Sequence, residues 1–365
     1  MNDSVELNRK HLYQFPWTKK DNPGGWIEVT DICNMECPGC FRHTLSGHRS
    51  LDDMKKEVIR LKELTNCSRI SIAGGEPLLY PHIVELVRFI SSMRLKPIIL
   101  TNGELLTVEL INDLRKAGLY QFYFHVDSNQ NRKAWLHKSE LELNTLRQYY
   151  IDLVNAHSRI KSGFLTTVSR TSLDSINDIL QWFYKNPGKV IHMAFIAFRG
   201  IPLLNEYRYL VNGKETDPAV LPNTIDQMDQ IDITIKEMYA IIKQQFPRLA
   251  PSAYLKGTTS PDTYKFLIIN SISSNDELYG SIGPKVVRLQ QRISHLLSSS
   301  YSDTLPRTGR EVFFMSFIDK EVRRALARYL RAILVKPVKL FRRMAVQGLV
   351  LQQPFEIING KMNLC

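Results

Sequence analysis

Short apolar runs alternate with amphipathic stretches over residues 26–198, and this alternation constrains the fold more than any other feature of the chain. Strand-like runs rich in β-branched and aromatic residues fall at 26–30, 69–73, 97–101, 120–126, 163–168 and 190–198. Stretches with helical spacing of apolar residues fall between them, at 51–64, 82–93, 106–117, 139–156 and 173–183. Such alternation is typical of βαβ units. It predicts a parallel sheet whose right-handed crossovers curl it into a barrel-like or a doubly wound form.

Polar or ligand-type residues follow shortly after most of these runs and help to choose between the two forms. They are Cys33, Gly74, Asn102, Asp127 and Arg170. Barrel-type enzymes build their sites from residues at the carboxyl ends of their strands. The positions therefore favour a barrel-like sheet with a site along this edge.

The alternation stops after residue 200, where residues 213–224 contain two prolines and residues 231–245 have helical spacing. The turn-rich segments that follow do not define an architecture. We therefore expect an N-terminal extension over 1–20, a barrel core over 21–202, and a mixed, mostly helical region over 203–365.

Three of the five cysteines, Cys33, Cys37 and Cys40, lie within eight residues in the spacing C-x3-C-x2-C. A [4Fe-4S] cluster is normally held by four thiolates, so three on one loop would leave one iron open for chemistry. The same spacing also fits a zinc site that lacks its fourth ligand, which His43 or His48 could supply. Structural zinc sites more often pair two C-x2-C knuckles, and this loop has one.

A second motif, Gly74-Gly75-Glu76-Pro77, ends the second strand-like run. Two adjacent glycines allow a ligand to approach the backbone closely, Glu76 offers a carboxylate, and Pro77 fixes the turn. Alone, the motif could be an ordinary turn. Its place 34 residues after the cysteines, at the end of the next strand, favours iron–sulfur chemistry over zinc.

The two motifs, in this order and at these strand ends, resemble those of the radical S-adenosylmethionine (SAM) family. The resemblance extends through Pro202, about half the chain. It implies a partial (β/α)6 TIM-like barrel in which Cys33, Cys37 and Cys40 hold a [4Fe-4S] cluster and SAM chelates the open iron. The reduced cluster would cleave SAM to a 5′-deoxyadenosyl radical that abstracts hydrogen from a substrate. An external reductant of flavodoxin or ferredoxin type is implied as a partner.

The resemblance also implies which residues contact SAM. In family members the segment matched by Gly74, Gly75, Glu76 and Pro77 contacts the methionine amino group. Many members place an aromatic residue just before the third cysteine, where it backs the adenine. This chain has Gly39 there, which puts the adenine contact in doubt, and Phe41 is the candidate substitute.

Residues that end the fourth and fifth strands usually reach the ribose and carboxylate of SAM. The matching positions are Asp127 or Ser128, Thr167 or Arg170, and, as a further candidate, Asn102. Each could equally be an ordinary strand-end cap or turn residue. If Asp127 faces the barrel interior, His125 shares that face by strand parity, as a substrate contact or a hydrogen-bonded core histidine.

The formal charge of +12 is concentrated near the C-terminus. Residues 320–343 contain nine Lys or Arg and a single acid, Glu321, interleaved with apolar residues. The pattern over 320–344 predicts a basic amphipathic helix, broken at Pro337, that contacts a membrane surface or presents a solvated face while packing on the core. No recognisable nucleic-acid-binding module accompanies the charge, so we expect no specific nucleic-acid binding.

The composition is that of a folded globular protein, and the five cysteines are too few and too clustered for a disulfide framework. No apolar run of about 18 residues is present, and residues 1–20 lack the apolar core of a signal peptide. We expect a cytoplasmic protein. The alternative is a cytoplasmic protein that associates with a membrane through residues 320–344. Cys67 is expected to be a small buried hydrophobe.

Cys365, the final residue, resembles the start of the cysteine-rich C-terminal extension, of SPASM type, with which many family members bind an auxiliary cluster. One cysteine cannot hold a cluster. Either the chain is a truncated version of a longer protein, which we favour, or Cys365 is an incidental thiol.

Two functions from different classes remain at this point. One is a radical SAM oxidoreductase or transferase that modifies a peptide or a lipid or isoprenoid. The other is a non-catalytic interaction protein that binds zinc or an inert iron–sulfur cluster. The intact Gly74 to Pro77 motif and the polar strand ends favour the enzyme.

Overall fold

The structure is a computed structural model, and it describes the following residues: 7–37, 40, 47–198, 201–202, 210–211, 214–215, 217, 224–225, 233–257, 263–274, 277–302, 309–335, 344–353, 355–358 and 361–364.

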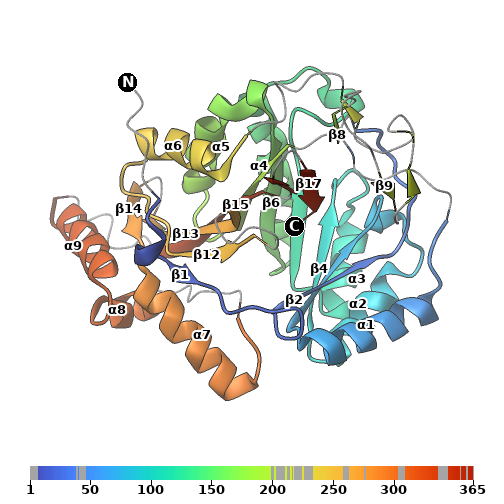
Figure 1. Cartoon of the computed structure of the whole chain (residues 1–365), viewed down its shortest axis with the longest axis horizontal. Coiled ribbons are helices and arrows are strands. Elements are labelled where there is room, and N and C mark those ends of the chain that lie inside the picture. The colour runs from blue at the N-terminus through green and yellow to red at the C-terminus, as the bar shows by residue number, and fades with distance from the viewer. Residues whose placement is uncertain are drawn as a thin grey trace.

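Six parallel strands form the centre of the structure, where the sequence predicts them (Figure 1). They are β2 (Gly24–Glu28), β3 (Arg69–Ala73), β4 (Lys96–Thr101), β5 (Gln121–His125), β6 (Lys161–Val168) and β7 (Val190–Ala197). Each pairs in parallel with the next along the chain. The predicted α/β class with a parallel sheet is confirmed.

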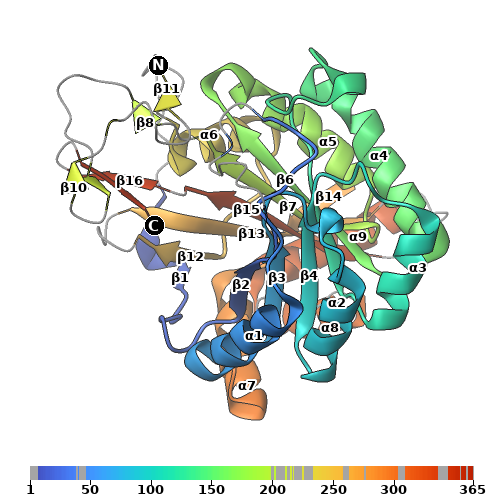
Figure 2. The same cartoon turned by 90° about the vertical axis from the view of Figure 1, so that its right-hand side faces the viewer.

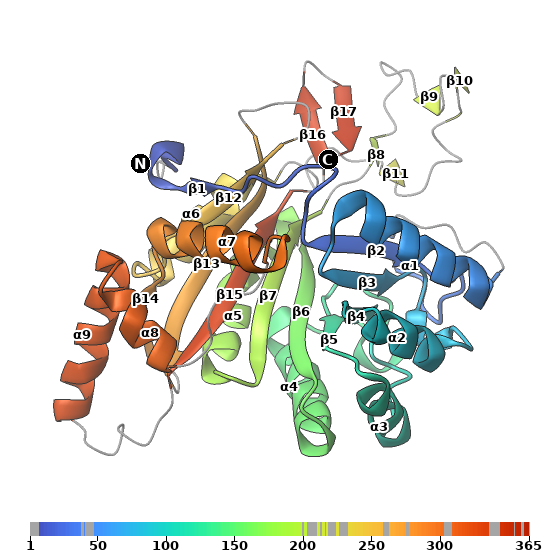
Figure 3. The same ribbon diagram turned by 90° about the horizontal axis from the view of Figure 1, so that it is seen from below.

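Five helices connect these strands and lie along one side of the sheet (Figures 2 and 3). They are α1 (Leu51–Thr65), α2 (Ile83–Ser92), α3 (Val108–Ala117), α4 (Glu140–His157) and α5 (Ile176–Lys185). Side chains cap the starts of α1, α3 and α4: Ser50 at α1, Thr107 at α3, and Ser139, which forms a capping box with Glu142, at α4. The connecting segments also contain short 3-10 turns at Pro77–Leu79, Lys133–Trp135 and Arg170–Ser175.

The helix-facing side of the sheet forms the main core. Successive strands contribute fully buried apolar residues at matching register positions, among them Ile72, Ile99 and Phe122, and then Phe124 and Phe164. Burying one such side chain stabilises the fold by about 1.5–3 kcal/mol. The opposite, inner face is only partly buried and is free to form a site.

One layer of the inner face alternates large side chains with glycines across five strands. Tyr123 pairs with Gly163, Gly163 with His192, His192 with Gly348, and Gly348 with Asn270. A Cβ at Gly163 would lie 2.7 Å from the Tyr123 ring, and one at Gly348 would lie 2.5 Å from the His192 ring. The two glycines therefore leave room for the Tyr123 and His192 rings, which stack at 6.1 Å.

The C-terminal region contributes strands to the same sheet, which the sequence did not predict. These are β12 (Ala253–Lys256), β13 (Tyr264–Ser274), β14 (Glu277–Ser281) and β15 (Ala345–Gln352), and β1 (Tyr13–Gln14) joins them from the N-terminus. The order β1-β12-β13-β15-β7-β6-β5-β4-β3-β2, with β14 beside β13, does not close into a barrel. The division at residue 202 stays a prediction, since the sheet continues across it.

The remaining elements lie outside that sheet. The helices are α6 (Ile235–Gln245), α7 (Pro284–Ser298), α8 (Gly309–Ser316) and α9 (Lys320–Val335), with a 3-10 turn at Arg9–His11. The small strand pairs are β8 (Ile201–Pro202) with β11 (Thr224–Ile225), β9 (Leu210–Val211) with β10 (Lys214–Glu215), and β16 (Phe355–Ile358) with β17 (Lys361–Leu364). None of the helices in the described ranges is both long and apolar enough to cross a membrane.

The fully buried Gln347 amide ties β15 to the parallel core. Its Nε2 donates to the carbonyl oxygens of Phe183 and Val190, both at 3.0 Å, and its Oε1 accepts from Ser273 Oγ at 2.6 Å. These bonds join the region after residue 202 to the region before it.

We predict that Gln347→Ala lowers the free energy of unfolding by about 2–4 kcal/mol, because it leaves buried polar partners unsatisfied. Urea denaturation followed by circular dichroism measures this. The matched control Gln244→Ala, at an exposed position of α6, should change the value by less than about 0.5 kcal/mol. Equal small effects of both substitutions would contradict the role given to Gln347.

Candidate cluster and cofactor site

The carboxyl ends of β2 to β7 meet at one edge of the sheet because all six strands are parallel. The segment that follows β2 carries the three cysteines. The segments that follow β3, β4, β5 and β6 carry Gly74, Asn102, Asp127 and Arg170. The sequence-predicted positions therefore lie along a single edge.

The cysteine loop is anchored at its base by a bridge between Thr30 and His48. Cys33 and Cys37 are partly buried, Cys40 is exposed, and the Cys40 amide donates to the Cys37 carbonyl at 3.0 Å. Phe41 and His43 lie outside the described residues. His48, the other candidate zinc ligand, places its ring against Tyr80 at 6.1 Å.

Burial and nearby charge raise the pKa of two of these thiols. Burial raises the pKa of Cys33, with Glu76 and Cys40 adding to the effect. Burial also raises the pKa of Cys37 to about 11, with Asp127, Cys40 and Cys33 contributing. Metal ions bound to Cys33 and Cys37 would offset this increase, because a coordinating thiol is deprotonated.

The Gly74–Gly75 backbone packs directly against the chain segment that leads into the cysteine loop. A Cβ at Gly74, whose φ is +146°, would lie 2.4 Å from the Thr30 carbonyl oxygen, and one at Gly75 would lie 2.2 Å from the Ile32 oxygen. The Gly75 amide donates to Thr30 at 2.7 Å and the Glu76 amide to Ile32 at 2.8 Å. Because glycine has no side chain, the Thr30 and Ile32 backbone can approach the motif this closely. The motif therefore packs against the start of the cysteine loop.

The Glu76 carboxylate is buried and binds the end of β4. It accepts from Thr101 Oγ1 at 2.6 Å, the Asn102 amide at 2.8 Å and the Leu78 amide at 2.9 Å. Burial raises the pKa of Glu76, and these donors offset part of that increase. The side chain holds the β3 and β4 ends together, so the surfaces left to a ligand at this motif are backbone.

Asn34, inside the cysteine loop, links it to β4. The Asn102 side-chain amide donates to Asn34 Oδ1 at 2.7 Å, and Asn34 Nδ2 donates to Glu104 at 3.2 Å. The buried Arg132 guanidinium donates to the carbonyl oxygens of Asn102 and His125, each at 2.7 Å. Sequence reasoning missed Asn34, Glu104 and Arg132. Only the place of Asn34 between two cysteines hinted at a role.

His125 and Asp127 share the inner face, as their spacing predicts. His125 Nε2 lies 2.7 Å from Asp127 Oδ2 and 3.2 Å from Thr167 Oγ1. The Thr167 and Asn129 amides donate to the Asp127 carboxylate at 2.9 and 3.0 Å. Burial by itself would raise the pKa of Asp127, but His125 and these amides outweigh it and hold the pKa below its usual value.

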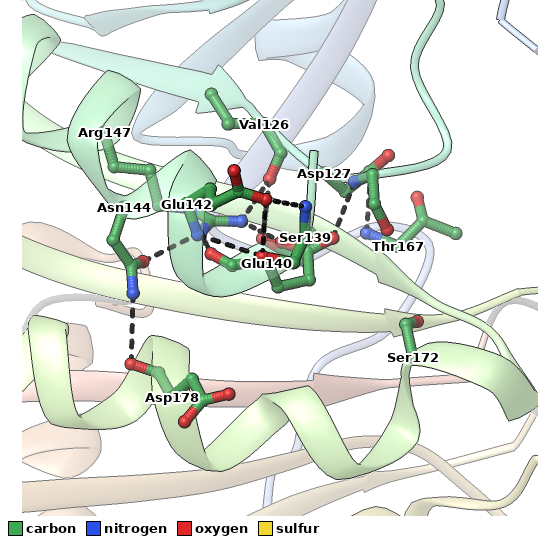
Figure 4. A network of polar contacts seen from close by, with 12 residues as sticks. Val126, Asp127, Ser139, Glu140, Glu142, Asn144, Arg147, Thr167, Ser172 and Asp178 are labelled. Atoms are coloured by element: carbon green, nitrogen blue, oxygen red, sulfur yellow. Dashed lines mark hydrogen bonds and ion pairs between the residues drawn. The ribbon is translucent and has the colours of Figure 1, made fainter. Parts of the chain in front are cut away.

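A buried ion pair behind this group holds the turn after β5 (Figure 4). Arg147 contacts the Glu140 carboxylate and donates to the Val126 carbonyl at 2.9 Å, while the Ser128 amide donates to Glu140 at 2.6 Å. Breaking a buried pair of this kind costs about 3–5 kcal/mol. The network positions Asp127 and leaves Ser128 exposed.

Arg170 points to the C-terminal region. Its guanidinium donates to Glu237 of α6 at 2.7 Å. Both side chains are partly exposed, so the pair adds little stability. It places α6 beside the β6 end.

No group of three or more His, Cys, Asp or Glu side chains converges on a metal-binding geometry within the described ranges. The donor types nevertheless suit an iron–sulfur cluster, since the loop after β2 carries three free thiols, those of Cys33, Cys37 and Cys40. Thiolates are the usual protein ligands of such clusters.

A comparison with family models identifies this part of the chain. The model of the radical SAM superfamily matches residues 27–183, from β2 to α5. Residues 27–183 form a radical SAM domain. Members of this superfamily are enzymes that use a [4Fe-4S] cluster and SAM.

Curated relatives share the domain at low identity. A 7,8-dihydro-6-hydroxymethylpterin dimethyltransferase of Methanocaldococcus jannaschii is 27% identical over 244 residues, which cover 63% of this chain and 45% of that protein. A GTP 3′,8-cyclase of Syntrophomonas wolfei subsp. wolfei is 25% identical over 179 residues, covering 47% and 54%. The chain thus spans about half the length of the curated relatives it matches.

Among solved structures, Streptococcus suis SuiB bound to S-adenosylmethionine aligns with a TM-score of 0.45 and 14% identity. The alignment covers 66% of this chain and 52% of SuiB.

We predict that Gly75→Ala in the radical SAM domain prevents assembly of the iron–sulfur site, because the added Cβ forces Ile32 away from the motif. Iron and sulfide content after anaerobic reconstitution should fall several-fold relative to the unsubstituted chain. Gly47→Ala is the matched control, since a Cβ there meets no atom within 4 Å. Normal cluster content in Gly75→Ala would show that the close approach is dispensable.

The pKa of Cys37 predicts slow alkylation of the metal-free chain. Thiolate is the reactive form, so a pKa of about 11 makes the rate rise about tenfold per pH unit between pH 8 and 10. At pH 8 the reaction with iodoacetamide should be about 100-fold slower than that of an exposed thiol of ordinary pKa. Peptide mapping by mass spectrometry measures it, with N-acetylcysteine as reference. Equal rates would contradict the burial of Cys37.

Proposed function

We propose that this chain is a radical SAM enzyme in which Cys33, Cys37 and Cys40 hold a [4Fe-4S] cluster. The observation that supports this most is the contact of the Gly74–Gly75 backbone with Thr30 and Ile32 at the root of the cysteine loop. When bound, the cluster and SAM supply a 5′-deoxyadenosyl radical that abstracts hydrogen from substrate.

The chain's own residues would bind and orient SAM. Backbone groups from Gly74 to Pro77 form the surface for its methionine end, while the Glu76 carboxylate fixes this segment to β4. Asn102 and Asp127 are largely occupied by internal hydrogen bonds, which suits positioning roles. The Ser128 and Thr167 hydroxyls remain the more direct candidates for the ribose and carboxylate, because Arg170 pairs with Glu237.

Substrate would occupy the inner face beyond SAM. This face offers Tyr123, His125 and His192 from the radical SAM domain, and β13 and β15 extend it with residues after 202. The proposed role of the C-terminal region as a substrate-binding or auxiliary region rests on this continuity. We propose a peptide or a lipid or isoprenoid as substrate, and a flavodoxin or ferredoxin as reductant.

We also propose that the protein works in the cytoplasm, in contact with a membrane surface through the basic stretch 320–344. Residues 320–335 of it form α9, and 336–343 lie outside the described residues, as does Cys365.

Reconstitution tests the proposed activity. The chain is reconstituted anaerobically with iron and sulfide and then incubated with dithionite and SAM, and 5′-deoxyadenosine is quantified by liquid chromatography. We expect product from the unsubstituted chain and from Cys67→Ala, whose thiol is buried and outside the loop. Cys33→Ala should yield none.

An iron–sulfur-replete chain that forms no 5′-deoxyadenosine, even over long incubation, would favour the non-catalytic iron–sulfur or zinc-binding interaction protein instead. Zinc retained in place of iron after purification under anaerobic conditions would point the same way.

A further inference from the structure

Exposed large apolar side chains gather on the last three helices. Of the seventeen such side chains in the described residues, eleven fall within 289–335. They are Leu289, Ile293, Leu296 and Leu297 on α7; Phe313, Phe314, Phe317 and Ile318 on or just after α8; and Leu330, Leu334 and Val335 on α9. Singly scattered exposed side chains need no explanation, whereas a contiguous exposed apolar patch is typical of an interaction site.

The centre of this group is an aromatic cluster on and just after α8. Phe314 and Phe317 are 68% and 69% exposed. The Phe313 ring lies 5.9 Å from Phe314 and 5.3 Å from Phe317, with both pairs edge to face. Val312 and Met315, on the other side of the same helix, are buried in a small core with β14 and α9. The helix is therefore docked by one face and presents the aromatic face outward.

The same segment carries most of the net charge of the chain. Residues 284–343 contain fourteen Lys or Arg against four Asp or Glu, a net charge of +10 out of +12 for the whole chain. On α9 the buried positions Val322 and Ala325 define the packed face, and Lys320 and Arg331 lie exposed on the other. Leu330 and Leu334 share that exposed face.

The helices α8 and α9 lie near the amino ends of the parallel strands, whereas the candidate site lies at their carboxyl ends. β15 is parallel to β7 and begins at Ala345, so the chain leaving α9 enters the sheet at the amino ends of the strands. β14, on which α9 packs, pairs with the last residues of the antiparallel β13, which also end there. Figures 1 and 3 show α8 and α9 side by side, remote from α1 to α3.

We propose that the exposed face of α8 and α9, centred on Phe314, Phe317, Lys320 and Arg331, docks on an anionic phospholipid bilayer. Aromatic and aliphatic side chains enter the boundary between headgroups and acyl chains, while Lys and Arg neutralise lipid phosphates. The charge selects an anionic surface, and the apolar side chains select a bilayer over a nucleic acid, whose phosphate backbone offers them no partner.

This docking would direct the site edge away from the bilayer, because the two lie at opposite ends of the strands. This conclusion about orientation rests on the proposed function and narrows its substrate class. A substrate that enters from the aqueous side, such as a peptide, fits the orientation better than a lipid drawn directly from the membrane. The docking itself depends on neither the cluster nor SAM.

Vesicle flotation with the full chain tests the proposal, and its readout is independent of enzyme activity. Vesicles of phosphatidylcholine with about one third phosphatidylglycerol are compared with pure phosphatidylcholine, at low and high salt. We expect binding only to the anionic vesicles, weakened at least about tenfold by high salt. Phe314→Ser with Phe317→Ser should weaken it about tenfold or more. Lys320→Glu with Arg331→Glu should do so by at least about twentyfold.

The matched controls change equally exposed residues on the helices that cover the core. They are Leu64→Ser with Leu141→Ser, and Arg60→Glu with Arg88→Glu. These should leave binding within about twofold, and unfolding curves confirm that every variant is folded. Equal loss in the controls, equal binding to neutral vesicles, or no vesicle binding would overturn the proposal. So would preferential binding of RNA, or self-association through this face in place of vesicle binding.

Discussion

The backbone contact between Gly74–Gly75 and Thr30–Ile32 is the interaction on which the proposed site depends. Approach this close excludes any side chain at either glycine. It joins the ends of β2 and β3 just where the cysteine loop begins, and Glu76 continues the connection to β4. Cys33 and Cys37 in this loop are partly buried, and burial raises the pKa of both thiols. The neighbouring strand ends support the base of the loop through Thr30, Ile32 and Asn34.

A second constraint is the alternation of large and small residues across the inner face. Tyr123 and His192 fill the space that Gly163 and Gly348 leave open. Gly348 belongs to β15, more than 150 residues after His192 in the chain. The C-terminal strands are thus fitted to the parallel strands by shape, and Gln347 adds buried hydrogen bonds across the same junction. The inner face is therefore shared by the radical SAM domain and the region that follows it.

The polar residues of the site edge fall into two kinds. Glu76, Asp127 and Arg132 are buried and bind the chain's own backbone, so their role in the structure is to position strand ends. Ser128 is exposed and Thr167 is partly exposed, with its hydroxyl 3.2 Å from His125 Nε2. A strongly basic, apolar surface lies at the other end of the strands. The two ends of one sheet thus present different chemistry.

The sequence by itself determined the local elements and the identity of the cysteine and glycine motifs. Helical and strand periodicity depends on neighbours within a few residues, and the cysteines that a cluster needs can be read directly from the sequence. The tertiary structure alone decided that β15 inserts beside β7, that Glu76 binds β4, and that Asn34, Arg132 and Glu140 hold the site. These are pairings across tens to hundreds of residues, and a short strand or a single buried charge carries no local pattern that names its partner.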